Sequence, residues 1–351
     1  MTAAEHRVQV LVIGGGQAGL AAGYHLRRAG LDFAILDAAP APGGAWQHYW
    51  ESLRLFSPAA YSSLPGRPMP GQAGTEWPDA EHVAEYLAEY EKRYELPVHR
   101  PVGVASVTNA GDGGLLVRTD EGDWHARALV SATGSWTRPF VPAVPGRELF
   151  TGRQLHTTGY HRATDFTGRR VVVVGGGNSG AQIAADLVGH AAAVRWVTRR
   201  PARLLPDEID GRALFEIATR RVQDGGPRIS DLGDIVATEP VRAARRAGLL
   251  TDHRMFTALT PAGPRWADGE PWPADAIVWC TGFRPALVHL APLALRTGAR
   301  GRIATTGTRA VSDPRIHLLG YGDWTGPASA TLIGVGRTAR QAVAEITGLL
   351  N

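Results

Sequence analysis

The chain has 351 residues, 44% hydrophobic and 20% charged, a length that favours two domains because single hydrophobic cores stop growing at about 250–300 residues. Its one cysteine, Cys280, excludes a disulfide framework, a Cys-x-x-Cys redox pair and a multi-cysteine metal site, and we expect no metal. Arginines scattered among acids give a net charge of +4, and there is neither a long apolar run nor an apolar signal core, so the sequence argues against nucleic acid, a membrane span and secretion, and predicts a cytoplasmic protein.

The chain begins with a strand, a glycine turn, a helix and a second strand. Residues 8–13 are a β-branched apolar run typical of a buried parallel strand, and the strand at 33–36 ends in an acid. The G-x-G-x-x-G turn between them lets the backbone approach a pyrophosphate at the helix N-terminus, while the acid accepts a ribose hydroxyl. The predicted cofactor-contacting residues here are Gly14, Gly16, Gln17, Ala18, Gly19 and Asp37.

An irregular, aromatic and proline-rich stretch follows the acid. Gly44 and Trp46 belong to a Gly-Gly-x-Trp sequence that many flavoproteins carry at this place, although a simple Pro/Gly turn is the alternative. The loop over 47–78 is long enough to be functional or disordered, and its aromatic residues argue against disorder. We expect it near the flavin and the substrate, with plain packing as the alternative.

Scaffold elements complete the first part. A helix is expected over 79–95, with Asp79 as its N-cap and a stripe of tyrosines that packs against the core. Three short strands between residues 102 and 130 indicate a β-meander. The last strand ends in an A-T-G sequence similar to the one that marks a chain crossover in flavoproteins with two dinucleotide sites. Its residues are Ala132, Thr133 and Gly134.

A second strand, glycine turn and helix lie over residues 170–189. The strand at 194–197 then ends in Thr-Arg-Arg and not in an acid. Because Arg can accept a 2′-phosphate while Asp favours a free 2′-hydroxyl, the first site suits FAD and the second NADPH; solvated arginines are the alternative. The predicted NADPH-contacting residues are Gly175, Gly177, Asn178, Ser179, Gly180, Thr198, Arg199, Arg200, Thr281 and Gly282.

After residue 200 the pattern of apolar residues predicts secondary structure less clearly, until the strand at 276–280. A helix is expected from 206 to about 218, and strands near 241–243 and 256–259. A clear buried strand at 276–280 ends in Thr-Gly, where we expect the chain to cross back; its cysteine is interpreted as a buried hydrophobe, with a reactive thiol as the alternative. A strand from 316 ends in a Gly-Asp pair whose acid can bond the ribityl chain of FAD, before the final helix. The pair is Gly322 and Asp323.

The joint between the two glycine turns reads F-x-G-x-x-x-H-x-x-x-Y over 150–160. Nearly the whole chain resembles the class B flavin-dependent monooxygenases. The motifs that carry the resemblance are this joint, both glycine turns, Gly-Gly-x-Trp, A-T-G, T-G-F and Gly-Asp. The final Tyr of the joint is more similar to the N- and S-oxygenating branch and to plant indole-pyruvate monooxygenases than to the Baeyer–Villiger branch. The sequences at 46–50, 205–212 and 279–285 resemble the flavin monooxygenases encoded in bacterial arsenic-resistance operons.

This resemblance implies an α/β fold with two Rossmann-like domains. A glutathione-reductase-like FAD domain would comprise 1–150 plus 284–351, with an NADPH domain inserted over 151–283. It implies hydride transfer from NADPH to FAD, O2 activation as a C4a-(hydro)peroxyflavin and oxygen transfer to a small soft nucleophile, such as an organoarsenical. An NADPH-dependent flavoprotein reductase or oxidase that produces H2O2 is the main alternative, and a non-catalytic nucleotide sensor is a third. A homodimer is compatible with the sequence.

One residue departs from the family pattern. N-oxygenating members carry an Asn in the segment that matches 55–57, whereas this chain has Phe56 at or next to that position. The resemblance therefore does not extend to the residue that helps to hold the oxygenated flavin. His156 and Tyr160 are expected to couple the two domains, with His156 in a positioning role. The candidate catalytic residues are Phe56, Ser57, His156 and Tyr160.

Overall fold

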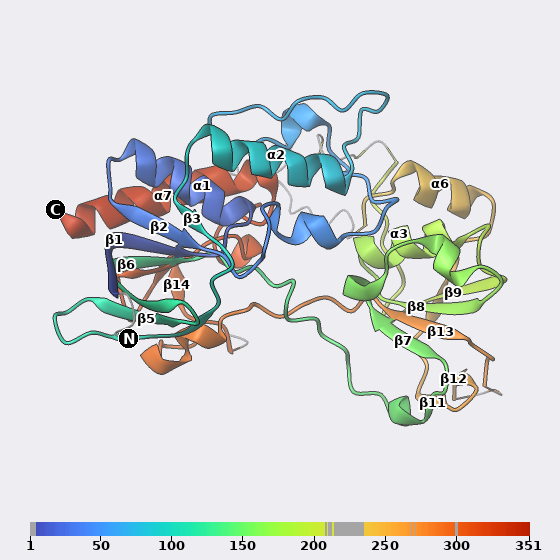
Figure 1. Cartoon of the computed structure of the whole chain (residues 1–351). Coiled ribbons are helices and arrows are strands. Elements are labelled where there is room, and N and C mark those ends of the chain that lie inside the picture. The colour runs from blue at the N-terminus through green and yellow to red at the C-terminus, as the bar shows by residue number, and fades with distance from the viewer. Residues whose placement is uncertain are drawn as a thin grey trace. The chain divides into compact units, whose positions relative to one another are not determined.

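The computed structural model describes residues 5–207, 209, 213, 235–267, 269, 271–298 and 301–351. Contacts divide the chain into two compact units. The first comprises Met1–Gln47, Ala59–Thr137 and Pro285–Asn351, and the second His48–Pro58 and Arg138–Arg284. Each unit carries helices on a sheet whose central strands are parallel, which confirms the predicted α/β class with two Rossmann-like parts (Figure 1). The functional domains proposed from the sequence stay a prediction, since a division by contacts does not test which nucleotide each part binds.

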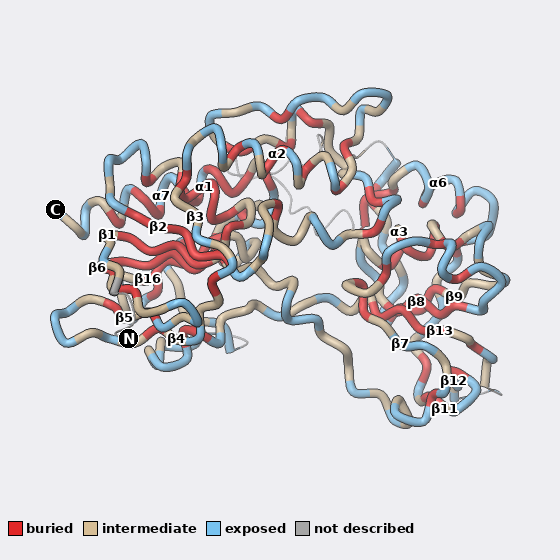
Figure 2. Tube along the Cα trace, viewed as in Figure 1, coloured by how far each residue is buried: buried red, intermediate tan, exposed pale blue. Residues whose placement is uncertain are grey.

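The first unit is built on a sheet whose central strands are parallel and buried (Figure 2). The parallel order is β16 (Ile316–Leu318), β6 (Gly122–Ser131), β1 (Glu5–Ile13), β2 (Phe33–Leu36) and β3 (Val98–His99). The short strands β14 (Thr305–Thr306) and β15 (Arg309–Ala310) extend the sheet beyond β16. Ile13 pairs with both Leu36 and Ser131, so the carboxyl ends of β1, β2 and β6 lie at one edge.

Helices cover one face of this sheet and a meander covers the other (Figure 1). The helices are α1 (Gln17–Arg28), α2 (Ala80–Arg93) and α7 (Leu332–Leu350). Strands β4 (Val104–Asn109) and β5 (Leu115–Thr119) pack Val107 and Val117 against the sheet residue Leu129, which confirms the meander. The Asp79 carboxylate accepts a 2.8 Å hydrogen bond from the His82 amide, so the predicted N-cap is confirmed.

The tyrosines of α2 hold the loop that precedes the helix. The Tyr86 hydroxyl donates to the Arg67 carbonyl at 2.7 Å and accepts from the Leu64 amide at 2.8 Å, while the Tyr90 hydroxyl donates to the Pro65 carbonyl at 2.6 Å. Burial raises the pKa of Tyr86 to about 12, so the hydroxyl stays neutral and keeps donating. The interpretation of the tyrosine stripe as packing is confirmed.

The second unit contains a five-stranded parallel sheet. Its order is β10 (Asp252–Arg254), β9 (Ala193–Thr198), β8 (Arg170–Val174), β13 (Ala276–Trp279) and β7 (Arg153–His156). One face carries α3 (Asn178–Leu187) and α6 (Glu239–Arg246) (Figure 1). The other packs against the hairpin of β11 (Ala258–Thr260) and β12 (Gly263–Arg265), so the hydrophobic core of this unit lies on both sides of the sheet.

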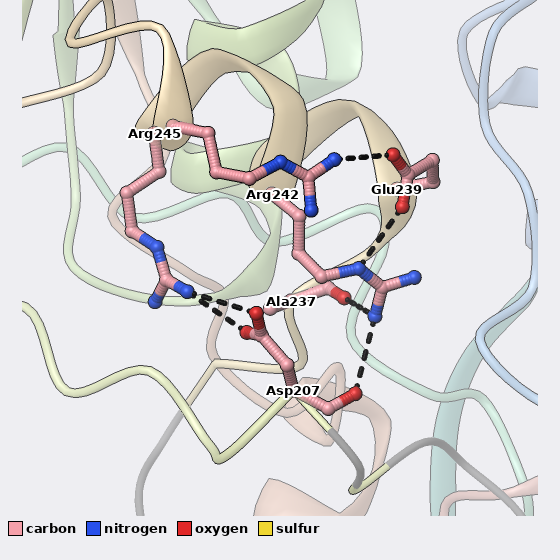
Figure 3. Close-up of polar contacts among 6 residues, drawn as sticks. Asp207, Ala237, Glu239, Arg242 and Arg245 are labelled. Atoms are coloured by element: carbon pink, nitrogen blue, oxygen red, sulfur yellow. Dashed lines mark hydrogen bonds and ion pairs between the residues drawn. The ribbon is translucent and has the colours of Figure 1, made fainter.

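The strand predicted near 241–243 is wrong, because these residues lie in α6. Thr238 precedes the helix, Pro240 occupies its first turn, and Val241 and Ala244 are buried three residues apart, which is helical spacing. Arg242 bonds Glu239, and Arg245 bonds both carboxylate oxygens of Asp207, as Figure 3 shows. Most of the helix predicted from 206 to about 218, and part of the 205–212 sequence, lie outside the described residues.

Candidate functional site

The first glycine turn joins β1 to α1 at the carboxyl edge of the first sheet. Gly14 has φ +105°, its amide donates to the Leu36 carbonyl at 2.7 Å, and a Cβ on it would lie 2.5 Å from the Ala132 carbonyl oxygen. A Cβ on Gly19 would lie 1.8 Å from the Gly14 carbonyl oxygen. No side chain at this position fits, so the glycines set the close approach of helix and strand.

The two helices that follow glycine turns lack side-chain caps. α1 starts after Gly16 and α3 after Gly177, and neither N-terminus receives a side-chain hydrogen bond, whereas α2 and α7 are capped by Asp79 and Thr331. The amide groups of the first helical turn have no partners within the helix. A phosphate group fits these donors and the positive end of the helix dipole.

Asp37 follows β2 beside the first turn. Its side chain is 12% exposed and accepts a 2.9 Å hydrogen bond from Arg100 Nε, and its other oxygen accepts from the Ala39 amide at 3.3 Å. Arg100 also bonds both carboxylate oxygens of Glu91 at 2.7 Å. Sequence analysis did not identify Arg100, because a partner 63 positions away leaves no local pattern.

Three further segments meet the first turn. The Trp46 indole donates to Gln17 Oε1 at 2.9 Å, and the Gln17 amide donates to the Ala330 carbonyl at 2.8 Å. A Cβ on Gly44 would lie 2.9 Å from the Cα of Gly16. Gln17 therefore ties the Gly-Gly-x-Trp segment and the approach to α7 to the start of α1, and Ala18 packs there against Gly320.

A partly buried network of polar side chains adjoins the A-T-G segment. The Thr133 hydroxyl donates to the Ala286 carbonyl at 2.7 Å and lies 2.9 Å from the Tyr321 hydroxyl, and the Gly134 carbonyl accepts from the Ala286 amide at 2.9 Å. Ser131 Oγ lies 3.1 Å from Nε2 of the buried His289, whose pKa burial lowers to about 4. These hydrogen-bonded side chains position the short turn that contains the two residues predicted to contact the ribityl chain. These are Gly322 and the exposed Asp323.

The second glycine turn repeats this geometry on β8 and α3. A Cβ on Gly175 would lie 2.1 Å from the Cys280 carbonyl oxygen, and one on Gly180 would lie 2.1 Å from the Gly175 carbonyl oxygen. The Trp196 indole donates to the Gly175 carbonyl at 2.7 Å, a contact that the sequence reading missed. Asn178 Oδ1 accepts from the Val236 amide at 2.8 Å, while Ser179 follows it in the first helical turn.

The end of β9 presents two arginines. Arg199 and Arg200 are exposed, and within the described part of the chain neither guanidinium has an ion-pair partner. The preceding Thr198 is buried, and its hydroxyl donates to Asp252 Oδ2 at 3.0 Å; the same oxygen accepts from the Ala202 amide at 3.0 Å. Asp252, which the sequence did not point to, thus bonds the residues on both sides of the two arginines.

His156 and Tyr160 make their described contacts inside the second unit. His156 Nε2 donates to the Gly282 carbonyl at 3.0 Å, and burial lowers the pKa of the ring, so both nitrogens of a neutral imidazole are occupied when Nδ1 accepts from the Thr158 amide at 3.4 Å. Tyr160 is fully buried, and its hydroxyl donates to Asp186 Oδ2 at 2.5 Å. These bonds fit a positioning role, which stays a prediction.

The segment 48–58, with the candidate residues Phe56 and Ser57, also belongs to the second unit. The Glu51 amide donates to the His161 carbonyl at 2.9 Å, and the Trp50 ring packs edge-on against Tyr160 at 6.2 Å between centroids. Phe56 and Ser57 are half-buried. Their catalytic role stays a prediction.

Other site types find little support. Cys280 is half-buried, less than the sequence interpretation as a buried hydrophobe expects, and desolvation raises the pKa of its thiol to about 12, which disfavours a reactive thiolate. Thr281 beside it donates to the Phe140 carbonyl. Within the described ranges, no group of three or more His, Cys, Asp or Glu residues is placed to hold a metal ion. No helix among the described residues is long and apolar enough to cross a membrane.

Two glycine turns, each at the carboxyl edge of a set of parallel strands, define a protein with two dinucleotide-binding folds. The chain belongs to the pyridine nucleotide-disulphide oxidoreductase family, whose model matches residues 11–210, and its similarities place it with the flavin monooxygenases. The predicted family resemblance and the prediction of an oxidoreductase are therefore confirmed.

The relatives are similar over long stretches. A flavin-containing monooxygenase from Stenotrophomonas maltophilia is 47% identical, with 99% of this chain and 100% of that chain covered and a TM-score of 0.89. An uncharacterized CzcO-like oxidoreductase from Geobacillus kaustophilus is 31% identical over 80% of this chain and 81% of its own length. The indole-3-pyruvate monooxygenase YUCCA1 of Oryza sativa subsp. japonica is 33% identical over 59% of this chain and 52% of its own length.

Proposed function

We propose that the chain is an FAD-dependent monooxygenase that takes electrons from NADPH and oxygenates a small, soft nucleophile. The observation that carries the proposal is the difference between the two glycine turns. The first ends at an enclosed acid, Asp37, and the second at exposed arginines, Arg199 and Arg200, without ion-pair partners in the described chain. An acid suits a free 2′-hydroxyl, as in FAD, and arginines suit the 2′-phosphate of NADPH.

The residues of the first unit fit FAD. The uncapped N-terminus of α1 would receive the pyrophosphate, Asp37 would accept a ribose hydroxyl, and Asp323 would bond the ribityl chain. The close contacts at Gly14 and Gly44 leave no room for a side chain, so the backbone there could approach the cofactor closely. When bound, FAD supplies the hydride acceptance and oxygen activation that side chains cannot provide.

The second unit would bind and orient NADPH. The N-terminus of α3 would receive the pyrophosphate, and the arginines, held by Thr198 and Asp252, would bond the 2′-phosphate. His156 would position the turn at Gly282 and not exchange protons, because both ring nitrogens are engaged. Phe56 and Ser57 would line the substrate space and exclude water.

We propose an organoarsenical as one substrate, because trivalent arsenic is a soft nucleophile that can accept an oxygen atom. The resemblance to the flavin monooxygenases of arsenic-resistance operons supports this choice. We also propose that the protein acts in the cytoplasm on a small molecule and O2; a homodimer stays a prediction.

Coupling of electron consumption to oxygen transfer tests the proposal. NADPH, O2, H2O2 and oxygenated product are measured together, with an organic thioether and a trivalent methylated arsenical as probe substrates. Near-equal NADPH consumption and product formation is the expected result. Consumption that yields only H2O2 with every probe would contradict it and support the oxidase alternative, which Phe56 favours because it stands at or next to the position where N-oxygenating relatives carry an Asn that can hydrogen-bond.

A further inference from the structure

Arg100 is the cation of a small enclosed cluster at the first dinucleotide site. Its side chain is 10% exposed and lies just after β3, between Asp37 at the end of β2 and Glu91 on α2. One nitrogen, Nε, donates to Asp37 at 2.9 Å, and both terminal nitrogens donate to the two oxygens of Glu91 at 2.7 Å. The pairing with Glu91 is the two-bond fork that binds a carboxylate or a phosphate most strongly.

The cluster touches the glycine turn itself. A Cβ on Gly15 would lie 2.6 Å from Asp37 Oδ2 and 2.8 Å from Arg100 Nη2. The guanidinium therefore lies where the ribose of a nucleotide on this turn is expected, since the acid after the second strand bonds the ribose. Burial alone would lower the pKa of Arg100, but its hydrogen bonds to Glu91 and Asp37 outweigh this and raise the pKa.

An arginine at this place would ordinarily attract a 2′-phosphate. Here Glu91 already occupies its fork, and one cation with two carboxylates leaves a net negative charge beside the turn. A dianionic phosphate would have to displace Glu91 and leave that carboxylate enclosed without its partner. The neutral 2′-hydroxyl of FAD meets no such obstacle and can still donate to Asp37.

We propose that Glu91 is a specificity-determining residue of the first site, which makes it reject a 2′-phosphate and so keeps NADPH out of the FAD position. The inference rests on the proposed FAD site. The second site shows the opposite arrangement, because Arg199 and Arg200 have no carboxylate partner in the described chain. Arginine thus disfavours a 2′-phosphate where a carboxylate pairs with its guanidinium, and favours a 2′-phosphate where no carboxylate does.

Competition against FAD tests this inference without measuring turnover. Flavin is removed from the full-length protein and FAD is bound again, with its fluorescence as the signal. Displacement of FAD by 5′-AMP is then compared with displacement by adenosine 2′,5′-bisphosphate, which carries the 2′-phosphate. Displacement of FAD reads only the first site, so binding of either probe to the second site does not enter the ratio.

The key variant is Glu91→Gln, and the matched control is Glu85→Gln, which removes the same charge from an exposed position of α2. For E91Q we expect the discrimination against the bisphosphate to fall about tenfold, the effect of one charge-assisted hydrogen bond gained by the phosphate. E85Q should match the wild type. Glu91→Asp keeps the charge but shortens the reach, so it should show a smaller fall and gives a second reading if E91Q folds poorly.

The double variant Arg100→Gln with Glu91→Gln separates the two residues. Without the cation, the gain of E91Q should disappear. The inference is overturned if E91Q and E91D both discriminate like E85Q, or if the double variant retains the gain. A wild-type protein that binds no flavin at all would instead contradict the proposed function, so the two failures are distinguishable.

Discussion

Replacement of Asp252 by Ala should weaken the selectivity for NADPH. Asp252 Oδ2 accepts from the Thr198 hydroxyl and the Ala202 amide, both at 3.0 Å, so one carboxylate holds both ends of the segment with Arg199 and Arg200. Hydrogen bonds to a charged group contribute about 1.5–3 kcal/mol each when enclosed, and a half-buried site reduces the combined effect to about 1.5 kcal/mol. Loss of this order corresponds to about a tenfold weaker use of the arginines.

Steady-state kinetics with both nucleotides provide the assay. We expect KM for NADPH to rise about tenfold with kcat nearly unchanged, while KM for NADH changes far less because NADH lacks the 2′-phosphate. Asp252→Asn keeps an acceptor oxygen and should fall between the wild type and D252A. Equal increases for NADH and NADPH, or no change for either, would refute the role given to the arginine segment.

Three further predictions concern stability. Gly180→Ala should destabilise the second unit by about 1–3 kcal/mol in chemical unfolding, because its Cβ meets the Gly175 carbonyl, whereas Gly177→Ala has open space and should alter nucleotide binding only. Tyr160→Phe should lose about 1–2 kcal/mol with its bond to Asp186, and an unchanged midpoint would contradict a formed bond. Burial lowers the pKa of His289 from 6.5 to about 4, so the neutral ring favours the folded state. Its contribution to the free energy of unfolding is fully present above pH 6.5 and is lost as the pH falls towards 4, by up to about 1.4 kcal/mol per pH unit. His289→Gln should reduce this pH dependence in urea titrations.

Features encoded by local patterns were predictable from the sequence. The buried strands at 33–36 and 170–174, the N-cap at Asp79 and both glycine turns depend on residues close together in the chain, and the structure has them as expected. The G-x-G-x-x-G spacing between an apolar run and a helical pattern predicts a strand, a tight turn and a helix packed against that strand.

Features that depend on distant partners were not predictable. Arg100 gains its meaning from Asp37 and Glu91, and Asp252 gains its meaning from Thr198, 54 positions earlier. Neither residue stands in a motif, so no sequence signal short of the fold itself could have identified it. The error at 241–243 has another origin: a single β-branched residue outweighed the helix-favouring alanines and arginines around it.

The central claim is that the first site holds FAD and the second prefers NADPH. Anaerobic rapid mixing of the purified, flavin-loaded protein with NADPH or NADH, followed by flavin absorbance, measures this directly, with Arg199→Gln combined with Arg200→Gln as the comparison. We predict that NADPH bleaches the flavin at much lower concentration than NADH, and that the double variant loses this difference while its NADH reaction persists. Purified protein without bound FAD, or equal half-saturating concentrations of the two nucleotides in the wild type, would contradict the claim.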